Sequence, residues 1–245
     1  MPSSPERLID LNADVGESPG EAPLYAFITS ANVACGGHTG TDETMRAAVR
    51  LALRHGVAVG AHPSYPDPAS FGRAMVNVAP AALTRAIAEQ VAALVRIAEE
   101  QGARVTHVKP HGALYGAAAA RSEVASAVAV GVASVSPALV LVGLAGSASL
   151  RLWREHGFRV AAEGFADRSY AADGTLVPRT VPGAVIADPA TCAAQAIRLA
   201  AEGDCATICV HGDTVGAAAI ASAVRHGLKA AGFTLSALVR QARET

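Results

Sequence analysis

Most of the residues that could do chemistry in this sequence follow short apolar segments at six places along the chain. They are Asp10, Asn12 and Asp14; Asn32 and His38; His62; Lys109 and His111; Glu163, Asp167 and Arg168; and His211 and Asp213. Imidazole and carboxylate groups act as general acids and bases, and together they also bind metal ions that assist hydrolysis. Lysine and arginine bind anionic substrates or stabilise anionic intermediates. The set predicts a site for polar chemistry, provided that the fold brings these segments together.

The histidines divide by their sequence context. The candidate site residues stand at predicted strand ends beside glycine or proline: His38, His62, His111 and His211. The others are predicted to be structural: His55, His156 and His226, which each precede a glycine at a helix carboxyl end, and His107, which lies deeper in its strand. A partly positive imidazole is favourable at a helix carboxyl end, which explains the first three.

Lys109 is one of only two lysines in the chain. It stands in an apolar strand between two histidines, so its side chain either pairs with Asp10 or Asp14 or holds an anionic substrate or intermediate. Arg73 and Arg168 are candidates to clamp a carboxylate or phosphate group, with a loop-anchoring salt bridge as the alternative.

The sequence alone leaves a metal site open. Histidines together with Asp10, Asp14 or Asp213 would supply nitrogen and oxygen ligands and leave a position for water. No H-E-x-x-H motif or comparable local spacing is present. The ligands of such a metal site would therefore come from different strands. Cys35 is interpreted as packing rather than as a nucleophile, since no base is assured beside it.

Short β-branched runs alternate with longer alanine-rich segments, which is the βα pattern of a parallel sheet or barrel. The predicted strands cover residues 8–11, 27–34, 57–61, 105–109, 139–143, 159–163 and 207–210, and the predicted helices cover 42–54, 80–101, 122–133, 147–156, 189–201 and 216–231. These units predict a single domain over residues 1–245, an α/β fold of the irregular TIM-like barrel type, with an open doubly wound sheet as the alternative. The irregular segment 165–188 is predicted to be an active-site loop. Because the carboxyl ends of barrel strands meet at one mouth, the polar residues are expected to converge there.

Side-chain alternation gives these residues a direction. Asp10, Asn12 and Asp14 share one face of their strand, and Lys109 and His111 share one face of theirs. Polar groups inside a barrel are costly unless they pair with one another or bind a ligand. The upper part of the barrel interior is therefore expected to hold the site.

Composition excludes several classes of protein. The 245 residues carry a net charge of -1, with 51% hydrophobic and 17% charged residues. This balance excludes a disordered chain and argues against a broad basic surface for nucleic acid. No signal peptide, uninterrupted apolar run of about 20 residues or CxxC spacing is visible, so a cytoplasmic protein without a membrane partner is predicted. A G-x-G-x-x-G after the first strand and a Walker A motif are both missing, which weakens the corresponding nucleotide-binding interpretations.

Seven segments, in order along almost the whole chain, resemble the LamB/YcsF family. They are residues 9–18 (IDLNADVGES), 29–36 (TSANVACG), 59–67 (VGAHPSYPD), 108–115 (VKPHGALY), 165–170 (FADRSY), 173–179 (DGTLVPR) and 208–214 (ICVHGDT). The resemblance implies a seven-stranded irregular β/α barrel of the glycoside hydrolase/deacetylase type. It also implies that the chain is the A component in the ATP-dependent opening of 5-oxoproline (pyroglutamate) to L-glutamate. The implied partners are 5-oxoprolinase subunits B and C, with ATP as co-substrate and Mg²⁺ accompanying ATP.

The resemblance and the strand-end pattern together assign the site. The expected catalytic residues are Asp14, His62, Lys109 and His111, and the expected substrate-binding residues are Asp10, Asn12, His38, Arg73, Asp167, Arg168, His211 and Asp213. The sequence departs from the family pattern at Gly37, Thr41, Ala74, Gly116 and Val215. These departures are expected to affect substrate fit or partner contacts.

A five-membered lactam is a poor electrophile, so transfer of phosphate from ATP to the amide oxygen would prepare its carbonyl carbon for attack by water. Such a site needs cationic groups for phosphate and carboxylate and a base for water, and His62, His111 or Asp14 are candidates for the base. Two alternatives from other classes remain open. One is a stand-alone metal-dependent amidohydrolase or deacetylase, and the other is a non-catalytic scaffold subunit.

Overall fold

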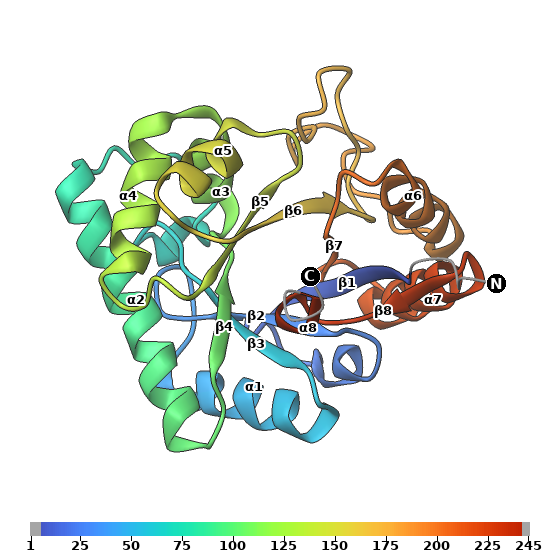
Figure 1. The fold of residues 1–245 in the computed structure, drawn as a ribbon, viewed down its shortest axis with the longest axis horizontal. Helices are drawn as coiled ribbons and strands as arrows, with labels where there is room; N and C mark the ends of the chain where they lie inside the picture. The colour runs from blue at the N-terminus through green and yellow to red at the C-terminus, as the bar shows by residue number, and fades with distance from the viewer. Residues whose placement is uncertain (1–5, 242–245) are drawn as a thin grey trace.

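Seven parallel strands close into a barrel in this computed structural model, which describes residues 6–241 (Figure 1). The strands are β1 (Arg7–Val15), β2 (Ser30–Ala34), β3 (Ala58–His62), β4 (Val105–Val108), β5 (Val140–Leu144), β6 (Val160–Phe165) and β7 (Thr207–His211). Neighbouring strands pair in the order β2-β3-β4-β5-β6-β7-β1, and β1 also pairs with β2, which closes the ring. The predicted seven-stranded barrel is confirmed, and the open-sheet alternative is excluded.

Helices surround the barrel on its outside (Figure 1). They are α1 (Asp42–His55), α2 (Pro80–Glu100), α3 (Gly112–Ala120), α4 (Ser122–Ala133), α5 (Ala148–Glu155), α6 (Pro189–Glu202) and α7 (Ala217–Ala230), with two short 3-10 helices at Ala22–Ala26 and Pro68–Ser70. None of the helices within residues 6–241 is both long enough and apolar enough to cross a membrane.

Local sequence signals set the ends of several helices. The Thr41 side chain accepts a hydrogen bond from the Thr44 backbone amide and so caps the start of α1, while Gly56 ends that helix in the left-handed conformation. The Asp188 side chain accepts from the Thr191 amide (2.7 Å) and caps α6 in the same way. These caps lie close to the predicted boundaries.

Two predicted strands differ from the observed ones in a way that matters for the site. β1 continues to Val15 rather than ending at residue 11, which places Asp14 in the barrel wall. β2 begins at Ser30 rather than at residue 27, because the preceding residues form a 3-10 helix and a turn. The alternation predicted for β1 is confirmed. Ile9 and Leu11 belong to the apolar core, while Asp10 and Asn12, on the other face of the strand, form polar contacts inside the barrel.

The last described elements lie at the amino-terminal end of the barrel. A short strand, β8 (Phe233–Leu235), pairs with the start of β1, and the helix α8 (Leu238–Gln241) follows it. Leu238 packs against Val140, Val142 and Ala161 from the first half of β5 and β6. Figure 1 shows α8 near the centre of the ring of strands. Apolar side chains of α8, β5 and β6 therefore pack together at this end of the barrel.

Gly60 in β3 makes room for a buried histidine, which leads to a stability prediction. A Cβ atom at position 60 would lie 2.1 Å from His107 Nε2, inside the barrel. Gly60→Ala is therefore expected to lower the free energy of unfolding by about 1–3 kcal/mol, measured by urea denaturation. Gly116→Ala in α3 is the matched control, because a Cβ there meets no atom within 4 Å. This control is expected to be neutral or stabilising, since alanine favours helix, and an equal effect of the two changes would contradict the prediction.

The structure shows which side chain lies beside Gly37, one of the positions where the sequence departs from the family pattern. A Cβ at this position would lie 2.3 Å from Gln90 Oε1 and 2.4 Å from Ser64 Oγ. The Gln90 side chain accepts from the Ser64 amide and donates to the Ser64 carbonyl, both at 2.9 Å. A glutamine from α2 thus occupies the space that a side chain at position 37 would take.

Candidate active site

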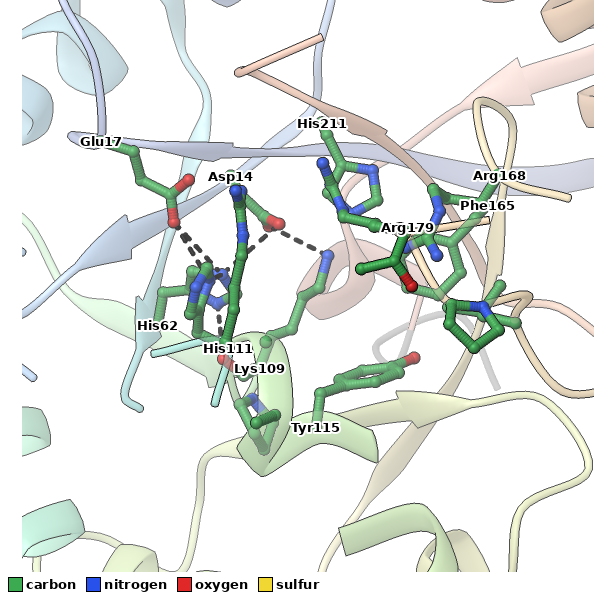
Figure 2. Close-up of a pocket in the computed structure, with 17 residues that line it drawn as sticks. Asp14, Glu17, His62, Lys109, His111, Tyr115, Phe165, Arg168, Arg179 and His211 are labelled. Atoms are coloured by element: carbon green, nitrogen blue, oxygen red, sulfur yellow. Dashed lines mark hydrogen bonds and ion pairs between the residues drawn. The ribbon is translucent and has the colours of Figure 1, made fainter. Parts of the chain in front are cut away.

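A pocket of about 390 Å³ opens at the carboxyl ends of the strands (Figure 2). Among the residues expected from the sequence, Asp14, His62, Arg73, Lys109, His111, Arg168 and His211 line it. Five others do not line it: Asp10, Asn12, His38, Asp167 and Asp213. All of these five except Asp10 contact a side chain that does line it.

Lys109 lies at the centre of the pocket floor, almost fully buried. Its ammonium group is 2.9 Å from Asp14 Oδ1, 2.8 Å from Glu163 Oε1 and 3.0 Å from Cys209 Sγ. Burial alone would lower the pKa of Lys109, but Asp14, Cys209 and Glu163 raise it well above its usual value. Lys109 is therefore a fixed cation that faces the pocket (Figure 2).

Asn12 and Asn32 hold this lysine and its carboxylates in place from below. Asn12 donates to Glu163 (3.0 Å), and its own oxygen accepts from Lys109 (3.3 Å). Asn32 donates to Asn12 (2.8 Å) and to Asp14 (2.9 Å), and its oxygen lies 3.0 Å from His107 Nε2. His107 is thus a satisfied group of the barrel interior, as its sequence position predicted.

Asp10 lies one layer deeper and belongs to the barrel wall rather than to the pocket. Its two oxygens accept from the hydroxyl groups of Thr29, Ser30 and Thr207, at 2.6 to 2.7 Å. Burial is the largest influence on this carboxyl group and raises its pKa from the ordinary 3.8 to about 6, against the effect of these hydrogen bonds. The structure gives Asp10 a role in joining β1, β2 and β7.

This raised pKa predicts a pH-dependent stability. Between pH 3.8 and about 6 the folded chain binds more protons at Asp10 than the unfolded chain does, so the free energy of unfolding falls as pH rises through this window. The contribution is roughly 3 kcal/mol in total. The Asp10→Asn variant lacks this titration. The free energy of unfolding of the wild type, relative to that of the variant, is therefore expected to fall from pH 4 to pH 7. Urea denaturation at several pH values measures this difference, and a constant difference would contradict the prediction.

Three histidines surround the carboxylate of Glu17 on one wall of the pocket. Glu17 Oε1 lies 2.8 Å from His38 Nε2, 3.2 Å from His111 Nδ1 and 3.7 Å from His62 Nε2. The His38 and His111 rings are stacked, with centroids 3.7 Å apart. Burial alone would raise the pKa of Glu17, but the hydrogen bonds from His111 and His38 hold it far below its usual value. Glu17 is therefore an anion inside this cluster.

Backbone carbonyl groups fix the orientation of two of these rings. His62 Nδ1 is 2.7 Å from the Lys109 carbonyl oxygen, and His111 Nε2 is 2.9 Å from the Phe71 carbonyl oxygen. Phe71 has a φ of 57°, a left-handed conformation that a bulky side chain rarely adopts. The strained residue directs its carbonyl group at His111, and its ring packs edge-on against His38 and His111.

A carboxylate–imidazole pair lies on the opposite side of the pocket. Asp167 Oδ1 accepts from His211 Nδ1 (2.9 Å), while Oδ2 accepts from the His211 backbone amide (3.0 Å) and from the Thr214 hydroxyl (2.9 Å). Burial would raise the pKa of Asp167, but His211 lowers it. Within residues 6–241 no protein group bonds the remaining His211 nitrogen, Nε2. The ring stacks on Phe165, so this nitrogen is available to a ligand.

Arginine side chains from two loops lie around the pocket. Arg73 and Arg179 both pair with Asp213, the latter at 3.3 Å. Arg168 instead donates to the carbonyl oxygens of Ala184 (3.2 Å) and Val177 (2.6 Å), so it braces the 165–188 loop from inside. That loop carries Arg168 and Arg179 into the pocket, in agreement with its predicted role.

The charged and aromatic lining residues that were not predicted as site residues are Glu17, Tyr115, Phe165 and Arg179. Glu17 had a usable signal, because it follows Asp14 in the same polar segment after β1. Tyr115 and Arg179 end two of the family-like segments, 108–115 and 173–179, but their place beside the pocket depends on tertiary packing. The Tyr115 hydroxyl and Glu163 Oε2 are each buried without a hydrogen-bond partner in the part of the chain that the structure describes.

Among residues 6–241, at least two groups of side chains have the donors and spacing to hold a metal ion. One consists of Asp14, Cys209 and His211, and the other of Glu17, His38 and His111. Both lie at the pocket, so a metal held by either would be next to a bound substrate.

Comparison with known proteins identifies the family of this chain. The model of the LamB/YcsF family matches residues 9–243. This chain belongs to the LamB/YcsF family. It is 49% identical to a protein of Chloroflexus aggregans and 45% identical to one of Heliobacterium modesticaldum, over 93% and 94% of this chain and 97% of each relative. Both relatives are named as the A subunit of 5-oxoprolinase.

Solved structures place the family within a wider fold group. A crystal structure of a lactam utilization protein from Thermus thermophilus superposes with a TM-score of 0.87 at 39% identity and covers 94% of this chain and 99% of that one. A family 4 carbohydrate esterase from Streptomyces lividans shares the fold at a TM-score of 0.51 and 14% identity, over 96% and 94% of the two chains. The deacetylase-type barrel expected from the sequence is thus confirmed.

Proposed function

We propose that this chain is the A subunit of a 5-oxoprolinase, which opens 5-oxoproline to L-glutamate with ATP as co-substrate. The observation that carries the proposal is near-full-length identity of 42–49% to relatives that bear the name of this 5-oxoprolinase component. The name of these relatives supports partner chains, and we propose that they are subunits B and C.

The pocket supports this reaction because it offers both kinds of group that lactam opening needs. Lys109 and the rim arginines Arg73 and Arg179 provide positive charge for the substrate carboxylate or for a phosphate group. The Tyr115 hydroxyl is buried, unpaired within the described residues and part of the pocket wall, which suits a hydrogen bond to the lactam. A volume of about 390 Å³ is enough for a single small ring compound.

His211 is our candidate for the base that activates water. Asp167 accepts from Nδ1 and thereby keeps the lone pair on Nε2, which has no protein partner within the described residues. Asp14, His62 and His111, the candidates from sequence, are committed to one another and to Glu17 on the opposite wall. A base fixed by a carboxylate and directed at the ligand is the arrangement that general base catalysis requires.

The test measures 5-oxoproline-dependent ATP hydrolysis and glutamate release with this chain alone and then with its partner subunits. We expect both products only when all subunits are present, and neither when this chain is left out. Equal rates with and without this chain would refute the proposal. A requirement for the chain that survives substitution of its strand-end residues, but not of its outer helices, would favour a scaffold. Glutamate release by this chain alone without ATP would favour the stand-alone amidohydrolase.

A further inference from the structure

Two histidines on the Glu17 wall direct bare nitrogens at each other. A carbonyl oxygen only accepts hydrogen bonds, so His62 must donate its Nδ1–H to Lys109, and His111 must donate its Nε2–H to Phe71. The other two nitrogens, His62 Nε2 and His111 Nδ1, then carry lone pairs in the neutral rings. They face each other at 3.0 Å. Two such acceptors repel, so a proton or a metal ion must lie between them. Burial would lower the pKa of His62, but Asp14 and Glu17 raise it, which favours a proton in the absence of metal, and a metal ion bound at this place would displace that proton.

Two carboxylate oxygens reinforce this demand for a cation. Glu17 Oε1 lies 3.2 Å from His111 Nδ1 and 3.7 Å from His62 Nε2. Asp14 Oδ2 lies 3.4 Å from His62 Nε2. All four side chains line the pocket and come from the ends of three strands (Figure 2). His111 Nδ1, Asp14 Oδ2 and Glu17 Oε1 therefore all lie within 3.7 Å of His62 Nε2.

The spacing of these donors is that of ligands around one ion. Nitrogen and oxygen ligands bind Zn²⁺ at about 2.1 Å, which separates them by about 3.0 Å at right angles and about 3.4 Å in a tetrahedron. Three of the observed separations, 3.0, 3.2 and 3.4 Å, lie in this range, and the fourth, between His62 and Glu17, is 3.7 Å.

The hydrogen bonds that the four donor side chains make through their other atoms, or from neighbouring residues, are also those expected around a metal site. Ligating histidines generally donate their other N–H to a carbonyl or carboxylate group, and both rings do so here. The second oxygen of Asp14 accepts from Lys109 and Asn32, both at 2.9 Å. His38 Nε2, 2.8 Å from Glu17 Oε1, orients that carboxylate. Each donor is thus held in its direction by a second contact.

We propose that His62 Nε2, His111 Nδ1, Glu17 and Asp14 bind one divalent transition-metal ion, such as Zn²⁺, at the wall of the pocket. Two imidazoles and two carboxylates suit a borderline metal better than Mg²⁺ or Ca²⁺, which prefer oxygen ligands alone. When bound, the ion would polarise a substrate oxygen or a water molecule. The site goes beyond the proposed function and does not depend on it, because binding needs neither ATP nor partner subunits.

The test uses the full chain after removal of metal by a chelator. Titration with Co²⁺, followed by its visible absorption bands and by metal analysis, is expected to show one equivalent bound. Anomalous diffraction at the cobalt edge is expected to place it between His62 and His111. Glu17→Gln is expected to weaken binding by about 10–100-fold, and His111→Ala by more.

His156→Ala is the matched control, because this exposed histidine lies at the end of α5 and has none of these contacts, and it is expected to bind Co²⁺ like the wild type. Circular dichroism checks that each variant is folded; if His111→Ala is not, the conservative Glu17→Gln decides. The proposal is overturned if the wild type binds no stoichiometric Co²⁺, if the ion lies elsewhere, or if folded Glu17→Gln binds it as tightly as the wild type. A shared proton would then fill the space between the rings. None of these readouts involves 5-oxoproline, so they stand apart from the test of the proposed function.

Discussion

Replacing Lys109 with methionine is expected to lower the free energy of unfolding by about 3–5 kcal/mol and to abolish glutamate release. Methionine keeps much of the length of the side chain but leaves Asp14 and Glu163 as buried carboxylates without their cation. It also removes the positive charge on the pocket floor. Urea denaturation measures the first effect, with the fluorescence of the single tryptophan, the buried Trp153, as the signal.

The chain offers a matched control and a rescue for this change. Lys229, the other lysine, is exposed on α7, so Lys229→Met is expected to change stability by less than about 0.5 kcal/mol. Adding Glu163→Gln to Lys109→Met removes one unpaired charge and is expected to restore part of the stability without restoring activity. If Lys109→Met were as stable as Lys229→Met, the ion-pair cluster would not contribute as argued.

Asp167→Asn is expected to reduce kcat for glutamate release by roughly 10³-fold or more, with a smaller change in KM. The amide oxygen can still accept from the His211 backbone and Thr214, so its NH₂ group must face His211 Nδ1. That nitrogen then becomes the acceptor, and the proton moves to Nε2, where a base needs a lone pair. The variant keeps the shape of the pocket but inverts the tautomer of one ring.

Nitrogen-15 NMR of the histidine ring reports this tautomer directly and separates a positioning role from a structural one. Asp204→Asn, at an exposed carboxylate after α6, serves as the matched control and is expected to leave kcat unchanged. A folded Asp167→Asn variant with wild-type kcat would refute the role of His211 as base.

The barrel and the direction of its polar side chains could be predicted because both follow from local pattern. The βα alternation predicted seven strands, and a period of two along β1 placed Asp10, Asn12 and Asp14 on the inner face. Depth within the barrel was not visible in the same pattern. Asp10 meets hydroxyl groups of neighbouring strands, whereas Asp14, four residues later, reaches the pocket.

The missed features depend on contacts between distant segments. The helix α3 was not predicted, because its sequence is almost uniformly small and apolar and shows no periodic polar face. Arg179 reaches the rim only through the fold of the 165–188 loop, in which Arg168 and Ser169 bond carbonyl groups later in the loop. The opposing lone pairs of His62 and His111 arise from two carbonyl groups far away in sequence, which no local motif encodes.

Because β8 and the apolar side chain of α8 pack at the amino-terminal end of the barrel, the pocket described here opens at the opposite end, beside Arg73, Arg179 and Asp213. On the proposed function, a partner chain that delivers an activated intermediate to this pocket would have to dock over these three side chains. Product release past the same side chains would then require that partner to move away.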